Sequence, residues 1–409
     1  MDPGTAWWIA LVGGALLAGA SVTAVLVAPR RTEALFAVLG ALVAAAALTS
    51  FAAIVGTTPR VNVALYAFTF LLAFAGGGYA LASTLLLSSV RPPAPAQATE
   101  TANEDPRPAV IICRCVEPES YAFSSTASML DGLASEGLLE PSVGTLPLLF
   151  FAQKARYRLA GGASQGVRDL STVAARLQDS MREVNPSVTW ATCSGAARLA
   201  VRVSQAVSAG HRRIVVVDLS VAPGIHFERA VAEADAVCAS APHTSIVHTT
   251  CMRDADSVLR HLANRILAAC KGEADSGVVL VGIGQPRERA TLDPRFGERE
   301  TSFLNRLKMI LRDEGMSGDH VRIAWSEWEE PDVTQEVRHL AALGCTRIRV
   351  VPATRPIESL ATSSDLRAAI RASRLDESAE VMIMPAWGSE SPVVGAIADS
   401  VRRALRDDQ

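Results

Sequence analysis

The sequence has very little charge at its start and almost no lysine. Residues 1–90 hold five charged side chains, whereas the whole chain of 409 residues has 39 basic and 42 acidic ones. Only three of the basic residues are lysines. The net charge of −3 argues against general nucleic-acid binding, which needs a basic face. The charge density of the remaining chain is that of a globular domain, which excludes a disordered or collagen-like protein.

The chain also lacks any CxxC pair. Its seven cysteines are an odd number, and several lie in apolar runs, where cysteine behaves as a small hydrophobic residue. We therefore expect no disulfide framework, as in a protein of a reducing compartment. The Cys113-x-Cys115 spacing is a weak metal-binding pattern, and the end of a strand explains it more simply.

Three long apolar stretches open the sequence. Residues 6–28, 34–55 and 61–90 contain no charged side chain. The shortest would be about 33 Å long as a helix, enough to cross a hydrocarbon core of about 30 Å. A cleaved signal peptide is excluded because no basic region precedes the first stretch and two more stretches follow. Residues 1–90 are therefore predicted to form three transmembrane helices in the lipid bilayer.

The arginines flanking these stretches predict an orientation. Arg30 and Arg31 follow the first stretch and Arg91 follows the third, on one side, while Arg60 lies alone on the other side. The positive-inside rule then places the large C-terminal domain of a multi-pass cell-membrane protein in the cytoplasm. No ionisable residue lies inside a stretch, whereas pumps usually have some. The helices are thus predicted to anchor the protein or to dock a membrane-protein partner.

The rest of the chain predicts an α/β fold. Residues 91–107 contain four prolines and no apolar periodicity, which is typical of an extended linker. From residue 108 onward, short β-branched apolar runs alternate with amphipathic helical patterns. Such alternation is typical of parallel sheets covered on both faces. We expect two similar Rossmann-like lobes, at 108–272 and 273–409.

An internal repeat supports the division into two lobes. Residues 210–217, GHRRIVVV, match residues 344–351, GCTRIRVV, at an offset of 134 residues. Each copy follows a helical pattern, and glycine there can end a helix. Each copy is also followed by a proline-containing loop, a further strand and a last helix. We therefore expect the two segments to occupy equivalent strands. Ligands of such sheets bind beyond the carboxyl ends of the strands, here between the lobes.

Four segments in this order resemble the ferrochelatases and their smaller class II chelatase relatives. They are residues 151–164 (FAQKARYRLAGGAS), 188–223, 278–286 (VVLVGIGQP) and 350–360 (VVPATRPIESL). The resemblance covers roughly residues 108–405. It implies a chelatase fold, a tetrapyrrole substrate and the insertion of a divalent metal, with Fe²⁺ as the substrate metal in heme biosynthesis.

The resemblance also implies particular site residues. Glu358 matches the family's glutamate, which makes it a candidate for accepting pyrrole protons or steering the metal; as a residue of a first helical turn it could equally be structural. The family's catalytic histidine is replaced by Ile283, which cannot accept a proton and is left as a candidate contact of the tetrapyrrole. The repeat offset places the loop of His226 opposite that of Glu358. His226 is therefore the alternative base and, with Glu358, a candidate metal ligand, unless it is a solvated loop residue.

The first matching segment supplies the remaining candidate tetrapyrrole contacts. Its cations suit the carboxylates of a tetrapyrrole, unless they form a solvated helix face, and its glycines suit close approach of a flat ligand. These candidates are Lys154, Arg156, Tyr157, Arg158, Gly161, Gly162 and Ser164. Four tryptophans are expected near strand ends, some of them in the core: Trp190, Trp325, Trp328 and Trp387.

Two functions are consistent with these residues. The first is a membrane-anchored, ferrochelatase-like enzyme, supported by Glu358 and by residues 157–164. The second is a degenerate chelatase that binds, delivers or senses a tetrapyrrole, or docks a membrane partner, without catalysis. Ile283 favours the second function.

Overall fold

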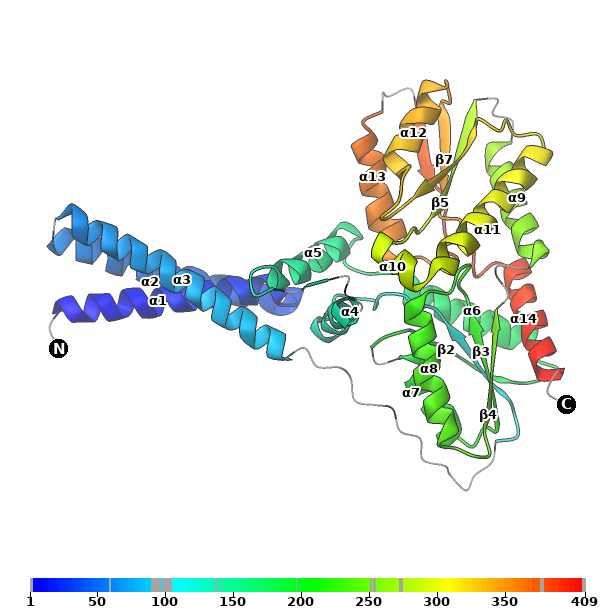
Figure 1. Ribbon diagram of the computed structural model, residues 1–409, viewed down its shortest axis with the longest axis horizontal. Helices are drawn as coiled ribbons and strands as arrows, with labels where there is room; N and C mark the ends of the chain where they lie inside the picture. The colour runs from blue at the N-terminus through cyan, green and yellow to red at the C-terminus, as the bar shows by residue number, and fades with distance from the viewer. Residues whose placement is uncertain are drawn as a thin grey trace. The chain divides into compact units, whose positions relative to one another are not determined.

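The structure is a computed structural model of the chain (Figure 1). It describes residues 3–58, 60–89, 96, 105–135, 137, 139–140, 142–195, 197–250, 252, 255–271, 275–375 and 379–406. The chain divides into two compact units. The membrane unit comprises residues 1–93 and 121–158, and the lobed unit comprises residues 94–120 and 159–409. The predicted linker at 91–107 lies largely outside the described residues.

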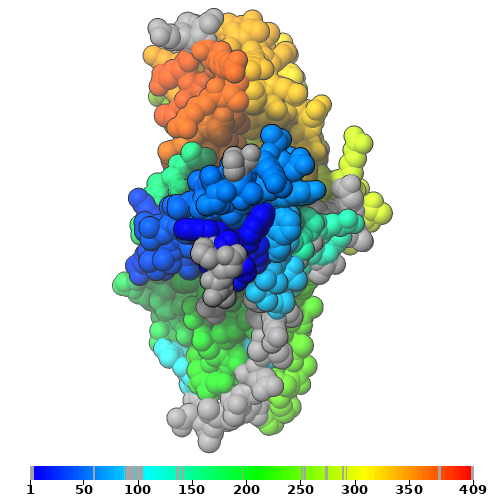
Figure 2. Space-filling model, turned by 90° about the vertical axis from the view of Figure 1, so that its left-hand side faces the viewer, coloured from blue at the N-terminus to red at the C-terminus, as the bar shows by residue number. Residues whose placement is uncertain are grey.

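Three apolar helices form most of the membrane unit, and each is long enough to cross a bilayer. They are α1 (Pro3–Val27), α2 (Arg30–Thr57) and α3 (Val61–Ser89). Side chains such as Leu42 and Leu65 are exposed, as suits helices that face lipid (Figure 2 shows these helices, in blue, facing the viewer). At Gly19 an added Cβ would lie 1.9 Å from the carbonyl oxygen of Ala75, so glycine lets α1 and α3 touch. These helices associate the chain with a membrane.

Two further helices belong to the membrane unit, although the sequence placed them in the first lobe. They are α4 (Phe123–Ser135) and α5 (Leu146–Leu159). The rings of Phe123 and Phe150 stack with centroids 5.1 Å apart, and the Tyr121 hydroxyl donates to the carbonyl oxygen of Val27 at 2.7 Å. Helices α4 and α5 therefore pack on each other, and the segment before α4 is hydrogen-bonded to the end of α1.

The lobed unit contains two four-stranded, wholly parallel sheets, which confirms the predicted fold class. The strand orders are β2-β1-β3-β4 and β6-β5-β7-β8. The strands of lobe 1 are β1 (Ala109–Cys113), β2 (Ser187–Ala191), β3 (Arg213–Asp218) and β4 (Ser245–Thr250). Those of lobe 2 are β5 (Ser276–Gly282), β6 (Val321–Trp325), β7 (Arg347–Val351) and β8 (Glu380–Ile383). The central strands β1 and β5 are buried along their whole length, as expected for parallel strands covered on both faces.

Helices cover both faces of each sheet, and one helix of each lobe also packs against the other lobe. Lobe 1 has α6 (Gly166–Ser180), α7 (Leu199–Ser208), α8 (Ile225–Ala239) and α9 (Asp256–Cys270). Lobe 2 has α10 (Arg287–Leu292), α11 (Pro294–Asp313), α12 (Val333–Ala342), the π-helical turn η1 (Ala361–Asp365), α13 (Leu366–Ser373) and α14 (Ser391–Arg406). Helix α9 packs on α11 and β7, while α14 packs on α6, β3 and β4 (Figure 1). One apolar core therefore runs through both lobes.

The internal repeat is visible in the strand register. The repeated segments form β3 and β7, which hold the same place in their sheets, and Gly210 and Gly344 precede them with φ of +86° and +89°. In lobe 1 the Leu219 N–H donates to the carbonyl oxygen of Cys113 at 3.1 Å. In lobe 2 the Ala353 N–H donates to that of Val281, also at 3.1 Å.

This register defines equivalent positions in the two lobes. Val217 pairs with Ile112 in lobe 1, and its repeat partner Val351 pairs with Leu280 in lobe 2. Counting on from these pairs, Cys115 of lobe 1 is the equivalent of Ile283 of lobe 2.

Candidate functional site

The carboxyl edges of the two sheets face each other, with buried charges between them. Arg114, directly after β1, is 8% exposed, and its Nη1 donates to Ser220 Oγ at 2.5 Å. Burial lowers the pKa of Arg114, and nearby Asp218 opposes this. From lobe 2, Arg355 lowers the pKa further and Glu300 raises it. Because loops of both lobes influence this guanidinium, the edge predicted to bind a ligand is where the lobes meet.

Asp218, the last residue of β3, is a buried carboxylate of unusual basicity. Its Oδ1 accepts a hydrogen bond from the Ser220 N–H at 2.8 Å, and its Oδ2 accepts none from any described residue. Burial raises the pKa of Asp218 to about 6, against these hydrogen bonds and the charge of Arg114. A carboxylate of this kind can exchange protons near neutral pH.

Glu300 of α11 organises the loops of lobe 2 and is fully buried. Its carboxylate accepts the N–H groups of Ile283 at 2.7 Å and Gly284 at 3.1 Å, together with the hydroxyl of Thr354 at 2.5 Å. Burial raises the pKa of Glu300, and these three hydrogen bonds oppose the rise. The backbone that carries Ile283 is thus fixed to the loop that follows β7.

Glu358 lies where the two lobes touch. Its backbone N–H donates to Asp169 Oδ2 of α6 at 3.0 Å, and its carboxylate accepts from Thr362 Oγ1 at 2.9 Å. Burial raises the pKa of Glu358, and the charge of Asp169 raises it further. Burial also raises the pKa of Asp169. One carboxylate from each lobe, each with a raised pKa, therefore belongs to a residue of this contact.

The predicted basic segment lies on α5, in the membrane unit, where much of it is already bonded. Lys154 is 3% exposed, and its Nζ donates to the carbonyl oxygens of Val25 at 2.6 Å and Ala28 at 3.3 Å. Arg158 forms an ion pair with Glu33. These contacts hold α5 against the end of α1 and the start of α2, a role that the sequence did not predict.

The other two candidates of α5 are also partly committed within the membrane unit. Tyr157 is buried, with its ring 6.2 Å from that of Tyr121. Arg156 Nη1 donates to Gln153 Oε1 at 3.1 Å. A role of α5 in tetrapyrrole binding stays a prediction.

The glycine segment forms the turn before α6. Gly161 and Gly162 have φ of +84° and +95°, a conformation that glycine adopts without strain. Ser164 is fully buried; its N–H donates to the carbonyl oxygen of Glu119 at 2.8 Å, and its hydroxyl accepts from the Gly166 N–H at 3.3 Å. These residues position the start of α6 and hence Asp169.

His226 lies in the first turn of α8 (Ile225–Ala239) and is half-buried. Within the part of the chain that the structure describes, no three His, Cys, Asp or Glu side chains lie close enough to hold a metal ion. His226 and Glu358 are accordingly not joined by a third ligand there, and their role as metal ligands stays a prediction.

The expectation of no disulfide is wrong for one pair. Cys115 and Cys193 are bonded, with Cα atoms 4.8 Å apart. Cys113 and Ala191 pair in the parallel register of β1 and β2, so the residues two positions further along each strand meet at the same edge. The sequence alone does not show which strands are neighbours. Cys113, Cys238, Cys270 and Cys345 form no disulfide, and Cys251 lies outside the described residues.

Three of the four tryptophans are packed against other residues, and the sequence predicted that some of the four would lie in the core. Trp325 is 8% exposed and Trp387 is fully buried, while the ring of Trp190 lies 5.2 Å from the guanidinium of Arg202. Trp328 differs, because 68% of it is exposed. The sequence did not predict four of the candidate site residues: Arg114, Asp169, Asp218 and Glu300. Two of them, Arg114 and Asp218, stand at the ends of apolar strand runs, which is a signal that could have found them.

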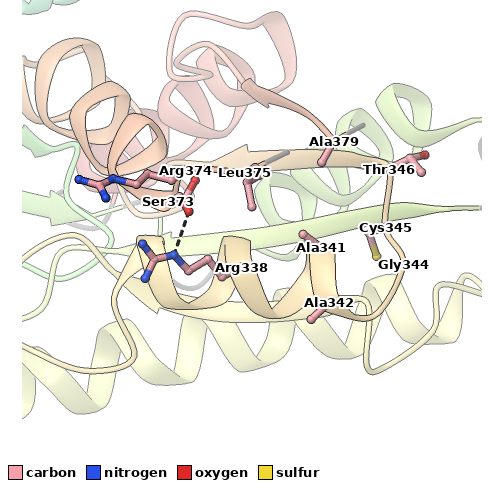
Figure 3. A pocket seen from close by; sticks show the side chains of 10 residues that line it. All are labelled: Arg338, Ala341, Ala342, Gly344, Cys345, Thr346, Ser373, Arg374, Leu375 and Ala379. Atoms are coloured by element: carbon pink, nitrogen blue, oxygen red, sulfur yellow. Dashed lines mark hydrogen bonds between the residues drawn. The ribbon is translucent and has the colours of Figure 1, made fainter. Parts of the chain in front are cut away.

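A pocket of about 450 Å³ lies elsewhere, at the amino end of β7 (Figure 3). Gly344 and Thr346 line it, and Arg338 borders it with its Nε donating to the carbonyl oxygen of Ser373 at 2.9 Å. Because the strands of these sheets present their carboxyl ends to the lobe junction, this pocket is separate from the candidate site.

Comparison with known proteins finds a coarse likeness, and only to solved structures. No protein-family model matches the chain, and no curated protein matches it. Among solved structures, the chain is similar to SirB from Bacillus subtilis with Fe³⁺, at 14% sequence identity and a TM-score of 0.47. The similarity covers 74% of this chain and 97% of SirB.

Proposed function

We propose that this protein is a membrane-anchored, ferrochelatase-like enzyme that binds a porphyrin at the facing carboxyl edges of its lobes and inserts a divalent metal, with Fe²⁺ as the substrate metal. The observation that carries this proposal is the contact of Glu358 with Asp169 of the other lobe, in which the Glu358 backbone N–H donates to the Asp169 carboxylate. Burial raises the pKa of both carboxylates, which makes them better proton acceptors. The ordered resemblance of the sequence to chelatases supports the choice of substrate.

Metal insertion releases two pyrrole protons as the metal binds the four ring nitrogens. A carboxylate with a raised pKa is suited to the proton step. In this proposal Glu358 takes the two protons in turn, one from each pyrrole N–H, and passes each through Asp169 to water. The hydrogen bond from Thr362 orients the Glu358 carboxylate. The contact with Asp169 holds the two lobes together at this point.

A second function is a carrier or sensor that holds a tetrapyrrole without inserting metal. Ile283 stands where the resembling family has its histidine, and the equivalent Cys115 is bonded to Cys193. Neither of these two side chains can bind Fe²⁺ in this state, because an isoleucine has no donor atom and a disulfide has no thiolate. This observation favours binding without catalysis.

An insertion assay separates the two functions. The full-length protein in nanodiscs is mixed with porphyrin and Fe²⁺ or Zn²⁺ without oxygen, and the absorbance bands report insertion. We expect Glu358→Gln to slow insertion by about 10²–10⁴-fold, the usual contribution of a general base. Glu314→Gln, at an exposed glutamate of lobe 2 after α11, is the matched control and should leave the rate unchanged.

Two other results of this assay would change the proposed function or the residue that carries it. Loss of insertion in His226→Ala with full activity in Glu358→Gln would make His226 the base. Porphyrin binding without insertion above the empty-nanodisc rate would establish the carrier function and reject the enzyme.

We further propose that the lobed unit faces the cytoplasm and that the apolar helices also dock a membrane-protein partner. The arginines beside the helices support the cytoplasmic side, whereas the Cys115–Cys193 disulfide is a bond that an oxidising compartment preserves. Reporters fused after the last residue decide between these sides. A cytoplasmic reporter should be active there, and an active alkaline phosphatase would reverse the orientation.

A further inference from the structure

One tryptophan of lobe 2 stands in an unfavourable backbone conformation without being packed. Trp328, in the loop after β6, has φ of +64° and is 68% exposed. A bulky residue at positive φ is a rare and strained choice. Burial does not compensate for this strain, because most of the indole is open to solvent.

The corresponding turn in lobe 1, which is one residue shorter, uses glycine. Thr192 and Trp325 are equivalent, since their N–H groups donate to the carbonyl oxygens of Ala197 at 2.9 Å and Pro331 at 3.0 Å. The third residue after Thr192 is Gly195, with φ of +81°, and the third residue after Trp325 is Trp328, with φ of +64°. Both turns thus place a left-handed residue at this position. Glycine meets this need without strain, so the turn itself does not explain a tryptophan.

The loop that carries Trp328 is fixed to the candidate site. The N–H groups of Ser326 and Glu327 donate to the carbonyl oxygens of Gly282 at 2.9 Å and Ile283 at 3.0 Å. An added Cβ at Gly284 would lie 2.2 Å from the carbonyl oxygen of Glu327, so the two loops are in contact. Trp328 is therefore held on a loop that is hydrogen-bonded to the one that carries Ile283.

The indole itself is oriented by its neighbours. Its Nε1 donates to Glu327 Oε2 at 3.2 Å, while Glu327 Oε1 accepts from Arg355 Nη2 at 3.2 Å. The Glu327 charge is therefore balanced by Arg355, and Glu329 is occupied by the Gln285 N–H at 3.0 Å. A strained, oriented and exposed aromatic ring at a binding edge is suited to stacking against a flat ligand.

We propose that Trp328 is a stacking platform for the planar face of the tetrapyrrole, an inference that rests on the proposed function. The ring would lie against the indole, with its carboxylates directed away from Glu329 and Glu330. Trp328 would then be a positioning residue that sets affinity and does not touch the protons that leave.

The test is a titration of the full-length protein in nanodiscs with metal-free protoporphyrin, followed by absorbance and corrected with empty nanodiscs. We expect Trp328→Gly to weaken binding by roughly 5- to 100-fold, the range found when an aromatic stacking partner is removed. Trp328→Phe should retain most of the affinity, and the neighbouring Glu330→Ala should not lose any. The thermal unfolding midpoint of Trp328→Gly should not fall, because glycine suits the turn.

The outcomes distinguish the two proposals. Unchanged affinity in Trp328→Gly, with the wild-type protein binding well, would overturn the stacking role and leave the proposed function standing. A lower unfolding midpoint in Trp328→Gly would show that the residue is structural and would also overturn it. No binding by the wild-type protein would overturn both.

Discussion

The two lobes share one architecture but secure equivalent loops by different means. In lobe 1 the loops after β1 and β2 are joined by the Cys115–Cys193 bond. In lobe 2 the equivalent loops are joined by hydrogen bonds, including Ser326 Oγ to the carbonyl oxygen of Ile283 at 3.2 Å. Lobe 1 uses Gly195 where lobe 2 uses Trp328. The comparison teaches that lobe 1 secures these loops covalently, whereas lobe 2 secures them by hydrogen bonds and exposes a tryptophan.

The largest expected effect concerns Glu300, whose carboxylate links the loops of lobe 2. Glu300→Ala would leave the buried N–H groups of Ile283 and Gly284 and the Thr354 hydroxyl without their acceptor. At 1–3 kcal/mol for each such group, we expect the free energy of unfolding to fall by about 5 kcal/mol. Denaturant unfolding measures this loss. Glu300→Gln, which keeps one acceptor oxygen, should lose clearly less; equal losses would contradict this account of lobe 2.

The second prediction concerns the covalent link of lobe 1. The bond closes a sequence separation of 78 residues, and the chain-entropy treatment assigns such a loop about 4.5 kcal/mol. The double variant Cys115→Ser, Cys193→Ser should therefore unfold at lower denaturant concentration. Mass spectrometry of the alkylated wild-type protein should find two more reactive thiols after reduction than before. Equal thiol counts would remove this difference between the lobes.

The third prediction uses Asp218, whose repeat position in lobe 2 is Pro352, which does not titrate. The folded pKa of about 6 lies above the ordinary 3.8, so the folded state binds the proton more tightly than the unfolded state. This contribution is full below about pH 4 and is lost as the pH rises through 6, a difference of about 3 kcal/mol. Asp218→Asn should match the wild-type stability at pH 4 and exceed it near pH 7. Parallel stability curves of the two proteins between pH 4 and 7 would contradict the prediction.

The smallest expected effect exchanges the two turn residues. Gly195→Ala should lower the free energy of unfolding by about 1 kcal/mol, because alanine at positive φ is strained. Trp328→Gly should raise it by a similar amount. Paired denaturant curves measure both changes, and the same sign for both would break the equivalence of the two turns.

The sequence predicted the architecture well because its patterns are local. The uncharged stretches, the alternation of strands and helices and the repeat at Gly210 and Gly344 each depend on neighbouring residues, and the structure confirms the elements they predicted. The packing of α9 and α14 against the other lobe and the attachment of α4 and α5 to the membrane unit depend on distant contacts. No pattern within one segment specifies such contacts.

The candidate site was less accessible to sequence reasoning for the same reason. Glu358 was found through a family resemblance, but its partner Asp169 lies 189 residues away along the chain. The Cys115–Cys193 bond depends on β1 and β2 being neighbours. Lys154 was predicted to meet a ligand carboxylate, whereas the structure bonds it to the carbonyl groups at the end of α1. In each case the missing information was which distant segment lies opposite.

The most direct test of the central claim is an experimental structure of the full-length protein with a bound metal-free porphyrin. The account predicts the macrocycle at the facing carboxyl edges of the two sheets, within reach of the Glu358 carboxylate and stacked on Trp328. A macrocycle bound at the amino end of β7, in the pocket beside Arg338, or only among the apolar helices would contradict the account.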